Sequence, residues 1–257
     1  MTFRNIFDTH AHYDDERFSE DVKNLFSEFP SKGIAYIVNC ATDISSCAKS
    51  KAFAEEFDYI YFAAGIHPHE SENAGRSYLD ELKSFAAHKK CVAIGEIGLD
   101  YHYDFSDRSF QLKVFEEQLI LAKELNLPAI IHDREAHADT LALLKIYRPE
   151  GILHCFSGSI ESAKEILNLG MYIGLGGAVT FKNAKKPVEV AKYVPDDRLL
   201  LETDCPYMTP VPFRGQRNDS TYISHTAQFI ASLRNTDTQT LLDLTAENAK
   251  RIFRISE

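Results

Sequence analysis

Short runs of hydrophobic residues recur along the whole chain, separated by longer segments of mixed composition. The runs are nearly continuous instead of alternating with polar residues, which is typical of parallel strands covered on both faces. Eight such runs predict eight strands, at residues 5–10, 34–40, 59–67, 91–98, 128–133, 151–156, 171–177 and 199–204.

Amphipathic segments lie between most of these runs. In residues 110–128, Phe115, Leu119 and Ala122 recur at helical spacing, and a proline closes the segment. A similar apolar stripe in residues 162–170 ends at a glycine, which is a common helix stop. The alternation of strand and helix predicts an α/β fold built on a parallel sheet.

Repetition of this strand and helix unit favours a closed (β/α)8 TIM barrel. The chain has 257 residues, close to the roughly 250 that are typical of such a barrel. An open, doubly wound parallel sheet is the alternative. No linker rich in proline or glycine divides the chain, so we expect one domain spanning residues 1–257.

The composition is that of an ordinary globular protein, with 44% hydrophobic and 26% charged residues. Its formal net charge of −10 argues against a broad basic surface for nucleic acid. A phosphate group could still be received by a local basic pocket or by bound divalent metal.

Five cysteines, an odd number with no CxxC pair, predict reduced thiols in a cytosolic protein. No apolar run is long enough for a signal peptide or a membrane span, so we expect a cytoplasmic protein with no membrane partner. The sequence shows no heptad repeat or exposed apolar helix that would favour oligomerisation, so a monomer is expected.

Histidines and carboxylates stand where the predicted strands give way to loops. In "FDTHAHYDD" two histidines lie one residue apart, and Asp8 precedes them with the spacing of one strand face. In a TIM barrel the functional groups gather at these carboxyl ends of the strands. The residues concerned are His10, His12, His67, Glu96, His132, His154 and Asp204.

Their convergence favours a metal centre over separate structural roles. A single histidine at a strand end is commonly a packed, hydrogen-bonded residue. Glu96 and Asp204, however, are costly in apolar strands unless they are paired or bind metal. Imidazoles and carboxylates without cysteine suit Zn, Mn, Co, Fe or Ni, and Mg where water completes the shell. Four of these histidines and the two carboxylates already exceed one tetrahedral site and can hold two ions, with one carboxylate bridging them.

The chain resembles the TatD family of metal-dependent deoxyribonucleases, within the amidohydrolase-like hydrolases. The motifs "FDTHAHYDD", "GEIGLDYH", "HCFSG" and "ETDCP", in that order, carry the resemblance. It implies a TIM barrel with two divalent cations. One site would consist of His10, His12, Glu96 and Asp204, and the other of Glu96, His132 and His154, with Glu96 bridging.

The resemblance also implies catalytic roles around the bridging Glu96. Asp204 would orient or deprotonate the attacking water, and His67 would contact the phosphate or the leaving group. Glu202 shares a strand face with Asp204 and would either orient a neighbouring ligand or form an internal salt bridge. Asp8 and Asp133 would each support a metal ligand. Alternatively, Asp8 would only hydrogen-bond to the backbone, and Asp133 would cap the following helix.

The chain departs from the family pattern in two places. Tyr13 stands where the family usually has an aliphatic residue or phenylalanine. In "RGQRNDS", Asp219 and Ser220 replace the commoner Glu-Pro after the asparagine.

Candidate substrate contacts lie in the loops after the predicted strands. Lys182 and Arg214 follow the seventh and eighth runs, where barrels often build a phosphate site, and ordinary solvated side chains are the alternative. Tyr101 could stack on a terminal base, or simply pack. Further candidates of these kinds are Lys185, Lys186, Arg217, His102, Tyr103 and Tyr207.

A narrow basic rim over buried metals favours the end of a single-stranded nucleic acid as substrate. The resemblance implies 3′-5′ digestion of DNA, with RNA as a further substrate. Two rival functions stay open: a metal-dependent ester hydrolase, such as a D-aminoacyl-tRNA deacylase, and a metal-stabilised barrel without enzyme activity.

Overall fold

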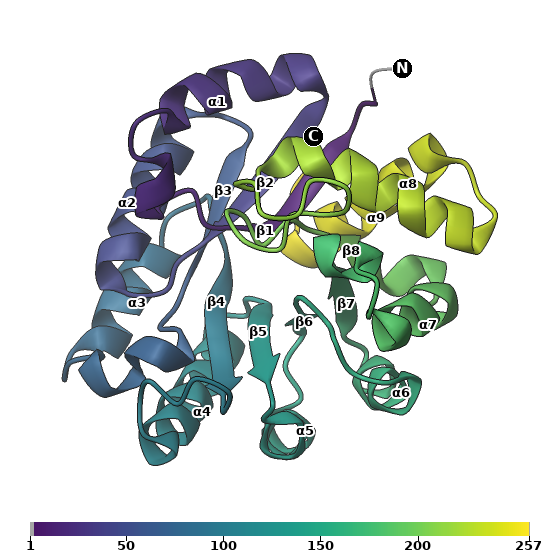
Figure 1. Cartoon of the computed structure of the whole chain (residues 1–257). Helices are drawn as coiled ribbons and strands as arrows, with labels where there is room; N and C mark the ends of the chain where they lie inside the picture. Colours follow the sequence, from purple (N-terminus) through teal and green to yellow (C-terminus); the bar gives the residue numbers. More distant parts are fainter. Residues whose placement is uncertain (1–2, 257) are drawn as a thin grey trace.

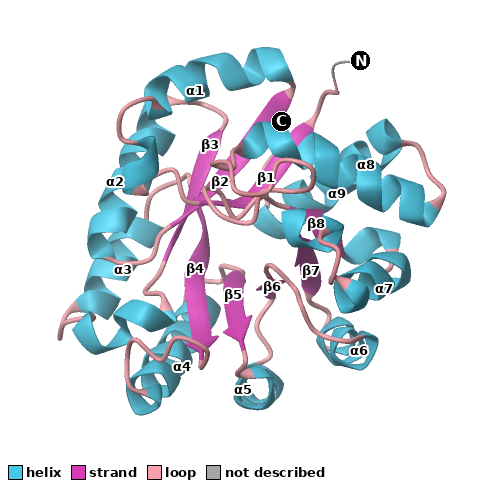
Figure 2. Ribbon diagram, in the orientation of Figure 1, coloured by secondary structure: helices cyan, strands magenta, loops and turns pink. Residues whose placement is uncertain are grey.

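The eight predicted strands are present, and each lies beside its neighbours in chain order (Figures 1 and 2). The computed structural model describes residues 3–256 of the chain. All neighbouring pairs from β1 to β8 are parallel. The strands are β1 (Ile6–Ala11), β2 (Ile34–Cys40), β3 (Ile60–Ala64), β4 (Cys91–Asp100), β5 (Ala129–Arg134), β6 (Gly151–Leu153), β7 (Tyr172–Leu175) and β8 (Leu199–Leu201).

Helices surround the strands on the outside, as Figure 1 shows. The two helices expected from amphipathic spacing are α4 and α6, which end within a few residues of the predicted stops. The helices are α1 (Val22–Glu28), α2 (Ile44–Glu56), α3 (Tyr78–Ala86), α4 (Arg108–Glu124), α5 (His137–Tyr147), α6 (Ile160–Asn168), α7 (Lys185–Tyr193), α8 (Ile223–Arg234) and α9 (Thr238–Phe253). A short 3-10 helix, η3 (Pro68–Asn73), follows β3.

The two ends of the sheet meet, so the sheet is a barrel. Ala11 at the end of β1 forms a parallel bridge with Cys205, which follows β8. The His12 N–H donates to the carbonyl of Cys205 at 2.8 Å, and the Asp204 N–H donates to the carbonyl of His10 at 3.0 Å. The TIM barrel prediction is therefore confirmed, and the open doubly wound alternative is wrong. Closure also brings residues nearly two hundred positions apart into contact.

The barrel interior is filled with apolar side chains below the predicted site. One buried cluster takes residues from every strand and from α9, among them Phe7, Ile130, Leu200 and Phe253. The rings of Phe7 and Phe253 lie 6.0 Å apart, which shows that α9 closes this end of the barrel. A second cluster packs the strands against the surrounding helices. The interior is thus a packed core and not a channel, as is usual for this fold.

Two further expectations concern the thiols and the membrane. All five cysteines are free, and all but Cys155 are buried, as the odd number without a CxxC pair predicts. Within residues 3–256, helices capable of crossing a lipid bilayer are absent.

The closure of the barrel depends on a buried hydrogen-bonded pair. The Thr203 hydroxyl donates to Asp8 Oδ2 at 2.7 Å and its N–H donates to Asp8 Oδ1 at 3.0 Å. We expect Thr203→Val to lower the free energy of unfolding by about 1–3 kcal/mol, because the buried Asp8 Oδ2 loses one of its two hydroxyl donors and keeps only that of Ser220. Urea denaturation measures the change.

Thr245→Val is the matched control, since the hydroxyl of this buried threonine bonds to carbonyls of its own helix, those of Leu241 at 3.0 Å and Leu242 at 3.2 Å. We expect it to cost less than about 1 kcal/mol. Equal losses in the two variants would contradict a special role for the pair that joins β1 to β8.

Candidate metal centre

Polar side chains form a layer above the apolar core of the barrel. On β5, the interior residue Ile130 is followed two positions later by His132, and in the β8 segment Leu200 is followed by Glu202. The same spacing links the interior residue of β6 to His154. Alternate residues of a strand share a face, so these polar groups stand directly above the core.

Strands β1 and β4 depart from this alternation at the residues that matter most. His10 comes three positions after Phe7, and Glu96 comes three positions after Ala93, so regular alternation would direct them away from the interior. The register of each strand against its neighbour shifts within these stretches. Such an irregularity re-aims side chains, and here it turns both residues into the barrel.

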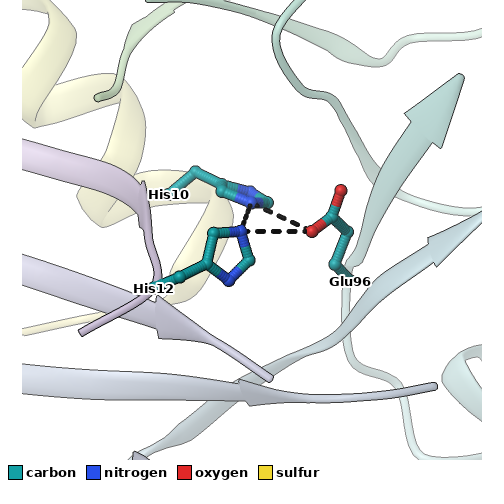
Figure 3. A group of neighbouring side chains, drawn as sticks. All are labelled: His10, His12 and Glu96. Atoms are coloured by element: carbon teal, nitrogen blue, oxygen red, sulfur yellow. Dashed lines mark hydrogen bonds and ion pairs between the residues drawn. The ribbon is translucent and has the colours of Figure 1, made fainter. Parts of the chain in front are cut away.

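The first group of donors comes from β1, from β4 and from the segment that follows β8. His10 Nε2 and His12 Nε2 lie 3.0 Å apart, and each lies 3.3 Å from Glu96 Oε2. Figure 3 shows the two imidazoles and the carboxylate pointing toward one another. Asp204 Oδ1 completes the group, at 3.9 Å from His10 Nε2 and 3.5 Å from His12 Nε2.

The second group surrounds the other oxygen of Glu96. Glu96 Oε1 lies 2.8 Å from His132 Nδ1 and 2.7 Å from His154 Nε2. His67 Nε2 lies 3.6 Å from the same oxygen, so this histidine, expected outside both groups, stands beside the second. The groups are contiguous, because the rings of His10 and His154 stack at 3.9 Å.

The outer nitrogens of two imidazoles are held by acceptors, which directs the inner nitrogens toward the centre. His12 Nδ1 lies 2.8 Å from the carbonyl oxygen of Cys40, and His132 Nε2 lies 3.1 Å from Asp100 Oδ2. Metal-binding histidines are typically oriented in this way by a carbonyl or a carboxylate. The arrangement therefore presents His12 Nε2 and His132 Nδ1 to the centre.

Asp100 contacts the centre, and the sequence alone did not indicate it. Its carboxylate is buried, and Oδ2 also lies 2.9 Å from His69 Nε2. The N–H groups of His102 and Tyr103 donate to Oδ1, each at 3.0 Å. The signal in the sequence was the place of Asp100 in "GEIGLDYH", the same motif that contains Glu96. Asp100 orients His132, and this links the loop after β4 to the centre.

Glu202 supports the strand that carries His154. Its Oε1 accepts the Cys155 N–H at 2.5 Å and lies 3.7 Å from His154 Nδ1. A Cβ at Gly174 would lie 2.4 Å from Glu202 Oε2, so the glycine leaves the space that the carboxylate occupies. The side chain is fully buried, which favours a positioning role over direct contact with substrate.

The pKa values at the centre are shifted because several imidazoles interact with the one buried carboxylate of Glu96. Burial raises the pKa of Glu96, but His154, His67 and His10 lower it by more, so that its pKa lies well below the usual value. Burial lowers the pKa of His12, and Asp204 and Glu96 outweigh that effect and raise it well above the usual value. A divalent cation satisfies all these donors without crowding protonated imidazoles together.

The donor set therefore fits divalent metal. Buried imidazole nitrogens and carboxylate oxygens without thiolates suit the borderline and harder divalent ions. The triads whose ligand atoms all lie within 4.8 Å of one another are His10 with His12 and Glu96, His10 with His154 and Asp204, and His67 with Glu96 and His132.

Asp8 lies below this centre and holds the closure of the barrel. Its four hydrogen bonds come from the Thr203 and His10 N–H groups and from the hydroxyls of Thr203 and Ser220. Burial raises the pKa of Asp8 to about 7 although these bonds lower it. Ser220 also bonds to the Tyr13 hydroxyl, at 2.7 Å. Tyr13 and Ser220, which the motifs marked as departures from the family pattern, are thus hydrogen-bonded to each other.

Asp133 binds the first residue of the next helix instead of a site ligand. Its Oδ2 lies 2.8 Å from Nδ1 of His137, where α5 begins. A cavity of about 220 Å³ opens beside it, lined among others by His154, Ser157 and Lys186. Of the lysines that follow β7, Lys186 therefore lies beside the candidate metal centre.

The predicted substrate contacts are placed less centrally. Lys182 is exposed after β7, and Arg214 stacks its guanidinium 3.7 Å above the Phe181 ring. Tyr101 donates its hydroxyl to Asp139 at 2.7 Å, and Arg108 covers its ring. The other candidates are engaged elsewhere: Arg217 pairs with Asp21, His102 bonds to Glu135, and the Tyr207 ring lies under Arg17.

Comparison with known proteins places the chain in a family. The family described as TatD related DNase matches residues 7–254, and the chain belongs to it. A protein of Bacillus subtilis, named uncharacterized metal-dependent hydrolase YabD, is 45% identical over 98% of this chain and all of its own length. The 3′-5′ ssDNA/RNA exonuclease TatD of Cronobacter sakazakii is 33% identical over 96% of this chain and 97% of its own.

A solved structure shows the same architecture. The TatD homolog YjjV from Escherichia coli K12 superposes with a TM-score of 0.92, at 32% identity, covering 98% of this chain and 99% of its own. The family resemblance predicted from the motifs is therefore confirmed, and so is the predicted barrel fold.

We expect metal to stabilise the folded chain, because the donors converge only in the native barrel. Mn²⁺ at about 100 times its dissociation constant should add about 2.7 kcal/mol, which raises Tm by roughly 5–10 °C for a chain of this size. Thermal unfolding measures this, and EDTA should reverse it. Glu96→Gln should remove most of the shift, and a Tm indifferent to metal would contradict the assignment.

Asp100→Asn tests the orientation of His132. The amide cannot accept as strongly from Nε2, so we expect Mn²⁺ affinity at one site to fall by about 10- to 100-fold. Isothermal titration calorimetry reads this directly. Asp104→Asn is the matched control, since Asp104 lies in the same loop and pairs with Arg108 on the surface. Identical affinities in the two variants would rule out the orienting role.

Proposed function

We propose that the chain is a divalent-metal-dependent hydrolase that cleaves phosphodiester bonds at single-stranded 3′ ends of DNA, with RNA as a further substrate. The observation that carries the proposal is the placement of Glu96, whose two oxygens face separate groups of imidazoles. One carboxylate between two donor groups suits a two-metal site. The names of the 33%-identical relatives support the choice of substrate.

The proposed metal ligands are those of the two groups. His10, His12, Glu96 and Asp204 would hold one cation, and Glu96, His132 and His154 the other. Cations bound there would acidify a water molecule and offset negative charge on the phosphoryl oxygens.

Two side chains have the geometry to act on substrate and water. Asp204 is 18% exposed and can take a proton from the attacking water at a carboxylate oxygen. The His67 ring is fixed because its Nδ1 accepts the His69 N–H at 3.1 Å, and Nε2 faces Glu96. It is therefore placed to hydrogen-bond a phosphoryl or leaving oxygen.

Activity on a labelled oligonucleotide tests the proposal. With Mn²⁺ or Mg²⁺, single-stranded DNA carrying a 5′ label should shorten stepwise from its 3′ end, and EDTA should stop the reaction. Glu96→Gln and Asp204→Asn should each lower kcat/KM at least about 100-fold, since even supporting residues of a metal site cost 10- to 100-fold. Glu72→Gln, an exposed carboxylate in η3, should behave as the wild type.

The same protein should be offered a D-aminoacyl-tRNA. Release of amino acid without release of nucleotide would overturn the nuclease proposal in favour of ester hydrolysis. Metal binding without turnover of either substrate would instead favour a structural barrel.

A further inference from the structure

Two aromatic rings beside the candidate metal centre are exposed to solvent. Phe105 is 67% exposed and Tyr103 is 47% exposed, both in the loop between β4 and α4. Their rings stack on each other with centroids 5.2 Å apart and planes inclined by 14°. Exposed aromatic surface of this kind commonly marks a binding site. We call this pair the aromatic platform.

A continuous series of ring-to-ring contacts links the aromatic platform to the donors around Glu96. The ring of His132 lies 4.7 Å from that of His67, and His67 lies 4.3 Å from His69. His69 then contacts Phe105 at 4.8 Å and Tyr103 at 5.6 Å. The platform is therefore the outer end of the wall whose inner end faces the candidate metals.

The loop that carries the platform is anchored on both sides. Gln111 donates to the carbonyls of Asp100 and Ser106, at 3.1 and 2.9 Å, which brackets the loop. Ser106 donates its hydroxyl to the His69 carbonyl at 2.7 Å and so ties the loop to η3. The Tyr103 ring is also covered by the Arg134 guanidinium, 4.6 Å from its centroid. The rings are thus held ready for a partner.

We propose that the aromatic platform is a base-stacking subsite for a nucleotide next to the scissile phosphate. The inference rests on the proposed function and names how its substrate is gripped. Phe105 offers the more exposed ring, while Tyr103 supports it and Arg134 adds positive charge beside it. Stacking of bases on aromatic side chains is the usual way to bind single strands without regard to sequence. The proposed contact replaces Tyr101, whose ring is covered by Arg108.

Fluorescence of a base analogue tests the subsite without requiring turnover. Short single-stranded DNA carries 2-aminopurine at one of its three 3′-terminal positions, and the protein carries Asp204→Asn so that the strand stays intact. Binding with Mn²⁺ should quench one position, and Phe105→Ala should abolish that quenching and raise Kd about tenfold. Phe105→Trp should retain both quenching and affinity.

An abasic residue at the quenched position provides a second measure. It should weaken binding to the parent protein as much as Phe105→Ala does, and should cost nothing further in the Phe105→Ala protein. Tyr193→Ala is the matched control, because Tyr193 is a 41% exposed ring near Lys164 at the end of α7. Binding and quenching that do not depend on Phe105 would overturn the subsite.

The outcomes separate the subsite from the proposed function. If the wild-type protein digests DNA while quenching is independent of Phe105, the subsite alone is wrong. If DNA is never cleaved but Phe105-dependent quenching is seen, the subsite stands and the nuclease proposal falls. Absence of both binding and cleavage overturns both.

Discussion

The buried carboxylate of Glu96 is the constraint around which the rest of the site is arranged. Its side chain is 3% exposed, and an ionised group in such a place requires compensating charge or hydrogen bonds. The imidazoles supply it from two sides, one set to each oxygen. The imidazoles cannot all be protonated at such short separations. The arrangement that stabilises Glu96 therefore also favours the binding of a cation.

The architecture meets this constraint through closure of the barrel and two local irregularities. Closure sets His10 and His12 against the segment after β8, which carries Asp204. The register shifts in β1 and β4 then turn His10 and Glu96 inward, where regular alternation would have turned them out. A barrel with perfectly regular strands would present fewer of these donors, so the irregularities at these two places contribute directly to the site.

Prediction from sequence succeeded where a residue's position in a strand decides its environment. Closure and the gathering of His132, His154 and Asp204 follow from strand count and from strand ends, and both were foreseen. The motifs also named Glu96, although alternation alone would have placed it outside. Asp100 was missed because its role depends on a contact with His132 from the next strand. The hydrogen bond between Tyr13 and Ser220 likewise joins loops more than two hundred residues apart.

The same limit applies to the basic residues, and it bears on how an acidic chain could hold a polyanion. Of the arginines predicted to form a positive rim, Arg217 is paired with Asp21. Two arginines outside that prediction, Arg17 and Arg108, are likewise paired with Asp15 and Asp104. Their charge is largely cancelled before any substrate arrives. With a net charge of −10, long-range attraction cannot supply the affinity. The affinity must then come from short-range contacts with the end of the nucleic acid. These contacts are cations at the metal centre and base stacking at its edge, and they engage few nucleotides at once.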